Sequence, residues 1–175
     1  DENTAEAVGG LRSNFVLAKA RSYDQDPEWG FIVLSEAAQK ALSPAVNDPG
    51  TAIAVMSSMM RLLVDRKPEA DPPDKEYDRL AIKPIDAAEW VKSGFAPIAR
   101  DGAAILEVGM VLQKTLAGIH RNAEEAAVSH AAAEVAAAAF ARAEQALDFA
   151  PDVCTLRQKR EALFGAAAVR ADEGE

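Results

Sequence analysis

The chain has 175 residues, of which 49% are hydrophobic and 6% aromatic, and its formal net charge is -9. A chain of this length buries enough surface to fold as one domain without a disulfide or a structural metal. Its acidic balance argues against direct binding of nucleic acid or anionic lipid, and its single cysteine excludes an intramolecular disulfide and a cysteine-based zinc site.

Alanine, leucine, valine and isoleucine supply most of the apolar content, which favours close helix packing over sheet formation. We therefore predict an all-α fold, a bundle of about five to six helices in a single soluble domain over residues 1–175. The sequence has no run of 18 or more uncharged apolar residues, so we expect no membrane-spanning segment within it.

The first predicted helix follows an ambiguous start, because residues 1–22 could form either a strand or a helix. This helix covers residues 27–42, where Asp26 is a favourable N-cap and Pro27 suits the first helical position. Pro44 pushes the residue before it out of the helical region and so ends the helix.

The same arrangement recurs at Asp48 and Pro49, which start a second helix that runs to about Arg66. This helix has little polar face, so we expect it to be central in the bundle. Its methionines are expected to serve core or interface packing: Met56, Met59 and Met60.

The second half of the chain starts with a proline-rich acidic segment at 68–83, which predicts a linker or excursion that could include a short strand at 77–82. Asp86 caps the next helix, which Gly94 and Pro97 are expected to break or kink. Three more helices are expected at about 101–121 and 123–147 and from about Pro151 to Gly165, before a frayed tail at 166–175.

Two polar segments frame the first helix: Arg21-Ser22-Tyr23-Asp24-Gln25-Asp26-Pro27 and Ala41-Leu42-Ser43-Pro44-Ala45-Val46-Asn47-Asp48-Pro49-Gly50-Thr51-Ala52. Together they resemble the signature of a family of predicted bacterial membrane proteins of unknown function, with the close likeness covering residues 21–66. The resemblance implies about four transmembrane helices followed by a soluble C-terminal region. This chain is similar to that region. The resemblance thus implies attachment to the bacterial inner membrane through absent N-terminal segments, with this domain in the cytoplasm, and it brings no catalytic residues.

The polar hinges at 21–27 and 43–51 offer candidate ligand-binding side chains, which are Arg21, Asp24, Asp26, Asn47 and Asp48. Clustered carboxylates could hold a divalent cation. The competing interpretation is that Asp26 and Asp48 cap the two helices. If the helices form an antiparallel hairpin, their first residues, and so the two aspartates, are roughly 24 Å apart. A shared ion would then need a partner chain, and Arg21 would clamp the neighbouring aspartates. We assign no metal, cofactor or catalytic residue.

Other chemically active side chains show no recognised catalytic or metal-binding spacing. His120 and His130 are expected at the surface or at helix ends, and Cys154 is expected to be a buried, inert thiol. These absences favour a non-enzymatic role, although an enzyme is not excluded.

We therefore expect an assembly or sensory domain that forms a homo-oligomer through its alanine-rich and methionine-rich helix faces. The alternative is a small-ligand or divalent-metal site at the two polar hinges, with enzyme activity as one outcome. Nucleic acid is not an expected partner.

Overall fold

The computed structural model describes residues 26–67 and 85–165, together with the isolated positions Val8, Gly10, Arg12 and Lys19. The chain divides into two compact units, Asp1–Gly30 and Phe31–Glu175. The expectations of a strand or helix within 1–22, a linker at 68–83 with a strand at 77–82, and a frayed tail at 166–175 fall outside the described residues, apart from the isolated positions. The single-domain assignment stays a prediction.

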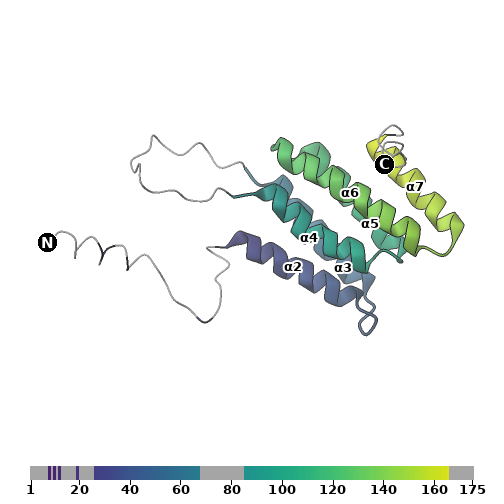
Figure 1. Ribbon diagram of the computed structural model, residues 1–175, viewed down its shortest axis with the longest axis horizontal. Helices are drawn as coiled ribbons and strands as arrows, with labels where there is room; N and C mark the ends of the chain where they lie inside the picture. Colours follow the sequence, from purple (N-terminus) through teal and green to yellow (C-terminus); the bar gives the residue numbers. More distant parts are fainter. Residues whose placement is uncertain are drawn as a thin grey trace. The chain divides into compact units, whose positions relative to one another are not determined.

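Six α-helices and no strand occur in the described part of the chain, which confirms the predicted all-α bundle (Figure 1). They are α2 (Pro27–Leu42), α3 (Pro49–Val64), α4 (Ala87–Asp101), α5 (Leu106–Asn122), α6 (Ala126–Ala146) and α7 (Ala150–Phe164).

Aspartate caps start three of these helices, as the sequence predicts. The carboxylates of Asp26, Asp48 and Asp86 each accept a hydrogen bond from the backbone N–H three residues later. The donor–acceptor distances are 3.0, 3.0 and 3.1 Å respectively. Each bond satisfies one of the N–H groups that a helix start leaves without an internal partner.

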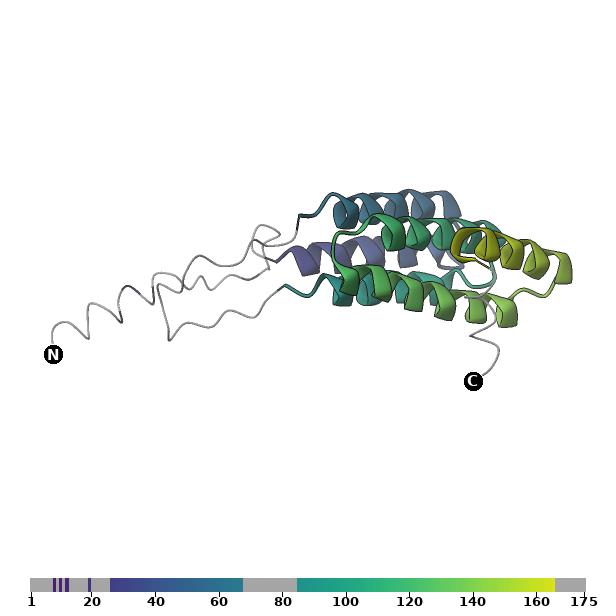
Figure 2. The ribbon, with the colours of Figure 1, turned by 90° about the horizontal axis from the view of Figure 1, so that it is seen from above.

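The helices of the unit that begins at Phe31 pack side by side, and successive helices run in opposite directions (Figures 1 and 2). Helix α5 packs on α3, α6 and α7, while α6 packs on α4, α5 and α7. The prediction that the second helix would be central is wrong, because α3 packs on α4 and α5 and keeps an exposed face that includes Leu62. The central positions belong to α5 and α6.

Helix α2 is attached to α4 by one buried aromatic ring and one buried hydrogen bond. The ring of Phe31 lies 6.2 Å from that of Trp90 and 6.1 Å from that of Phe95, measured between centroids. One turn further along, the hydroxyl of Ser35 donates to the carbonyl oxygen of Gly94 at 2.7 Å. Ser35 is buried, so this bond satisfies a hydroxyl that would otherwise be costly to remove from water.

Gly94 and Pro97 do not break α4, which continues from Ala87 to Asp101. Glycine is needed at 94 because a Cβ there would lie 2.5 Å from the Phe31 ring and 2.7 Å from the Met59 side chain. Pro97 lies in the C-terminal half of the helix, where its missing N–H leaves the carbonyl of Ser93 without its usual helical donor.

The next boundary also differs from the prediction, because a turn at 102–105 separates α4 from α5. In this turn, the backbone N–H of Gly102 donates to Ile98 and that of Ile105 donates to Gly102. Residue 101 therefore ends one helix, whereas the sequence pattern placed it at the start of another.

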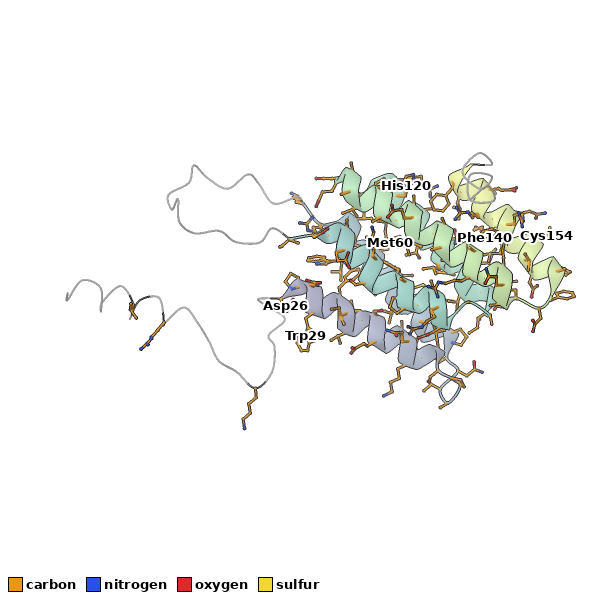
Figure 3. All side chains as sticks on the ribbon, viewed as in Figure 1. Asp26, Trp29, Met60, His120, Phe140 and Cys154 are labelled. Carbon is orange, nitrogen blue, oxygen red and sulfur yellow. The ribbon has the colours of Figure 1, made fainter. Side chains whose placement is uncertain are left out.

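Helix α7 covers a smaller core on the outer side of α5 and α6, where Phe140, Ala143 and Leu156 are buried (Figure 3). The guanidinium of Arg160 is also buried there and lies over the rings of Phe140 and Phe164, at 5.4 and 5.6 Å from their centroids. Stacking on aromatic faces lets a weakly hydrated guanidinium lie in an apolar environment.

Gly94→Ala should destabilise the chain by about 1–2 kcal/mol, because overpacking against the buried Phe31 ring exceeds the helix-propensity gain of about 1 kcal/mol. Gly109→Ala is the matched control, since its Cβ would meet Leu156 at 3.4 Å, an ordinary contact. Urea denaturation of both variants measures the effect. Equal responses of the two variants would contradict the close approach of α2 and α4.

Candidate functional site

The polar hinge between α2 and α3 is a hydrogen-bonded turn. The carbonyl oxygen of Ser43 accepts from the backbone N–H groups of Val46 at 3.0 Å and Asn47 at 2.8 Å. The N–H of Asp48 reaches back to the carbonyl of Ala41 at 2.8 Å, which closes the loop against the last turn of α2. These bonds satisfy backbone groups that would otherwise need water.

Asn47 has a left-handed backbone conformation, with φ of 49°, which asparagine adopts more readily than most residues. It is exposed, as are Pro44, Ala45, Val46 and Asp48. The tip of this hinge therefore lies at the surface, and its backbone is shaped by its own hydrogen bonds.

Asp48 uses both carboxylate oxygens on one residue. Its Oδ1 accepts from the backbone N–H of Thr51 at 3.0 Å, and its Oδ2 accepts from the Thr51 hydroxyl at 2.6 Å. The side-chain bond from Thr51, followed by the backbone bond, lowers the pKa of the Asp48 carboxyl. A carboxylate with both oxygens engaged in a cap is a poor first choice as a metal ligand.

The structure describes three of the five candidate ligand-binding residues, which are Asp26, Asn47 and Asp48. Asn47 and Asp48 adjoin each other in the hinge, whereas Asp26 precedes α2 in the chain and accepts from the N–H of Trp29 at 3.0 Å. Arg21 and Asp24 lie outside the described residues. Within the described ranges, no group of three or more His, Cys, Asp or Glu side chains is arranged to hold a metal ion.

The expected position of His120 is confirmed, because it is exposed in the last turn of α5 (Figure 3). Its Nδ1 lies 3.0 Å from both the hydroxyl and the carbonyl oxygen of Ser129, and its ring faces Phe164 at 5.8 Å. The Ser129 hydroxyl donates to the carbonyl of His120 at 2.7 Å. The hydroxyl proton is thus committed to a backbone acceptor, and the pair joins α5 to α6.

The prediction of a buried Cys154 is wrong, since its thiol is exposed (Figure 3). Helix α7 buries Leu156, and a residue two positions away points about 200° round an α-helix from it. Met56 and Met59, by contrast, are fully buried and confirm the core-packing interpretation. His130 is also exposed and lies 3.1 Å from Glu134.

Sequence reasoning did not identify an open depression of about 350 Å³ on the surface of α4 and α6. Its lining residues are Glu89, Lys92, Ser93, Ala96, Pro97, Arg100 and Arg142. Within α4 the charged residues recur at helical spacing, which is an ordinary sign of a solvated face. The contribution of Arg142 depends on how α6 is aligned with α4, and no local sequence pattern reports that alignment.

Asp48→Ala should lower the midpoint temperature of unfolding at neutral pH, whereas Asp48→Asn keeps one acceptor oxygen and should lower it less. Because folding lowers the pKa of this carboxyl, its stabilisation is present above the ordinary pKa of 3.8 and is lost as pH falls through the lowered pKa. Circular dichroism should show the gap between wild type and Asp48→Asn shrinking in that acidic range. A gap that persists at the lowest pH where the chain stays folded would refute the cap.

Comparison with known proteins gives one family. No helix in the described ranges has both the length and the apolar character needed to cross a membrane. No curated protein and no solved structure gives a significant match to the chain. Residues 1–118, more than half of the sequence, match the family described as "Predicted membrane protein (DUF2254)", in agreement with the resemblance carried by the two polar segments. The chain therefore belongs to this family of predicted membrane proteins, whose function is unknown.

Proposed function

We propose that this chain is the assembly domain of a bacterial inner-membrane protein and that it self-associates outside the bilayer through the exposed face of α3. We call this surface the α3 outer face and define it by Gly50, Thr51, Ala54, Ser58, Arg61 and Leu62. The membrane context rests on the family, and the mode of assembly rests on the character of this face.

The observation that carries the proposal is an exposed helix surface whose only charged member is Arg61, near its C-terminal end. Charged residues make up 27% of the sequence, yet none occurs between residues 49 and 60. Gly50, Thr51 and Ala54 are nevertheless exposed, and Leu62 at the other end is 57% exposed. An exposed leucine in line with small residues is a surface that a second helix could cover.

The α3 outer face is self-complementary if two copies pack antiparallel about the helix midpoint. Leu62 of one copy then lies opposite Gly50 of the other, and Ala54 lies opposite Ser58, at both ends of the two-fold interface. The small residues allow the helices to approach closely, so that each leucine fills the space over a glycine.

Charge also favours this arrangement. Arg61 is exposed near the C-terminal end of α3, and Asp48 is exposed at its N-terminal end. Antiparallel packing brings Arg61 of one copy near the Asp48 end of the other and aligns the two helix dipoles in opposition. Asp65 then comes opposite Asn47, whose amide can donate a hydrogen bond.

The alternative of a small-ligand or metal site at 21–27 and 43–51 stays a prediction. The engagement of both Asp48 oxygens by Thr51 argues for the structural role of this hinge. A cytoplasmic position is part of our proposal. It is supported by the resemblance, and the exposed thiol of Cys154, which forms no disulfide, is compatible with a reducing compartment.

Leu62→Glu should raise the dissociation constant of the homodimer at least tenfold, roughly 1.4 kcal/mol, because each dimer would bury the introduced charge twice. Phe149→Glu is the matched control, since Phe149 is 63% exposed in the connection between α6 and α7. Sedimentation equilibrium over a concentration series measures both. A wild-type chain that is monomeric throughout, or equal effects of the two variants, would contradict the proposal.

A further inference from the structure

The depression on α4 and α6 has an unusual alignment of charges. Helices α4 and α6 lie side by side and run in the same direction (Figures 1 and 2). The Nζ of Lys92 lies 2.9 Å from a carboxylate oxygen of Glu134, so these two residues are at a similar level along the two helices. Eight residues further along each helix come Arg100 and Arg142, which are therefore at similar heights. Both line the same depression.

The two arginines differ in what they already contact. The guanidinium of Arg100 bonds both carboxylate oxygens of Asp101, at 2.7 and 3.2 Å, and also the side-chain oxygen of Gln39 at 3.2 Å. Arg142 is exposed and makes no hydrogen bond or ion pair with the described part of the chain. It therefore keeps all its donors for a ligand, and its charge is not neutralised by a neighbouring carboxylate.

A second polar group lies at the wall of the depression between the two charged ends. The hydroxyl oxygen of Ser93 is buried and has no hydrogen-bond partner among the described residues. Pro97 lacks an N–H, so the carbonyl of Ser93 also loses the donor that a regular helix would supply. Buried hydroxyls are rarely left without a partner, so this wall of the depression has polar groups that the described residues do not satisfy.

We propose that this depression binds a small phosphate-bearing anion, held by the guanidinium groups of Arg100 and Arg142, with the unsatisfied polar groups of Ser93 in the wall beside it. Arginine suits the several oxygens of a phosphate because its donors form a planar fork. Glu89 at the far end of the depression keeps the anion near the two arginines by repulsion. The proposed ligand is a free anion, for which inorganic phosphate is the probe.

The site is independent of the proposed assembly. The α3 outer face belongs to α3, whereas the anion site belongs to α4 and α6. A chain that binds phosphate but does not dimerise, or the reverse, would therefore separate the two proposals.

The test is thermal unfolding of the full 175-residue chain in rising inorganic phosphate, compared with sodium chloride at matched ionic strength. Ligand binding stabilises the folded state in proportion to the logarithm of ligand concentration, so phosphate at about ten times its dissociation constant should raise the midpoint by roughly 2–5 °C. Arg142→Gln should abolish this rise. Lys114→Gln removes an exposed positive charge on α5 and should keep it.

A second readout separates binding from structure. Without phosphate, Arg142→Gln should leave the midpoint unchanged or raise it, because it relieves repulsion from Arg100 and breaks no contact. Amide NMR shifts should saturate with phosphate at Lys92–Arg100 and Arg142. Equal midpoint rises in chloride and phosphate, an undiminished phosphate response in Arg142→Gln, or shifts that never saturate in this segment would overturn the proposal.

Discussion

The close approach of helix backbones at small side chains is the constraint on which this structure depends. Five of the eight buried residues of α6 are alanines, and they are Ala131, Ala132, Ala136, Ala139 and Ala143. This flat surface lets α4 and α5 pack on α6 at once. The side-chain amide of Gln113 on α5 consequently reaches the carbonyl oxygen of Ala136 at 2.9 Å, a bond made in the buried interior. At the edge of the bundle, Gly94 of α4 likewise allows α2 to approach closely, because it leaves space for the Phe31 ring.

Helix starts were predictable from sequence because capping is local. Asp48 followed by Pro49 places a side-chain acceptor and a residue without N–H at the two positions where the helix needs them. The course of α4 was not predictable in the same way. Gly94 is typical of a helix break when read alone, and only the Phe31 ring, more than sixty residues earlier in the chain, explains why no larger residue fits.

The same distinction applies to the candidate sites. The Asp48 cap and the exposed position of His120 follow from residues within one or two helix turns. The exposure of Cys154 and the edge position of α3 depend on which face each helix turns toward its neighbours, and both were predicted wrongly. The depression at Arg100 and Arg142 depends on how α4 and α6 are aligned, and these helices are separated in the sequence by α5. Local sequence patterns therefore carry no signal for it.

The residues that determine the fold of this chain are different from those proposed to bind partners. The polar hinge between α2 and α3 reverses the chain through its own hydrogen bonds. The methionines Met56 and Met59 of α3 are buried in the core. The surfaces that we propose for partners lie elsewhere, on the outer side of α3 and in the depression on α4 and α6. Membership of a family of predicted membrane proteins supplies the context in which an assembly surface would act.

The alanine surface of α6 can be tested directly by measuring the free energy of unfolding of Ala132→Leu beside Ala141→Leu. Ala132 is fully buried and Ala141 is exposed on the same helix, so both changes add the same side chain and the same helix propensity. Close packing predicts a loss of about 1–3 kcal/mol for Ala132→Leu and a change within about 0.5 kcal/mol for Ala141→Leu. If leucine were tolerated equally at both positions, α4 and α5 could not approach α6 as described.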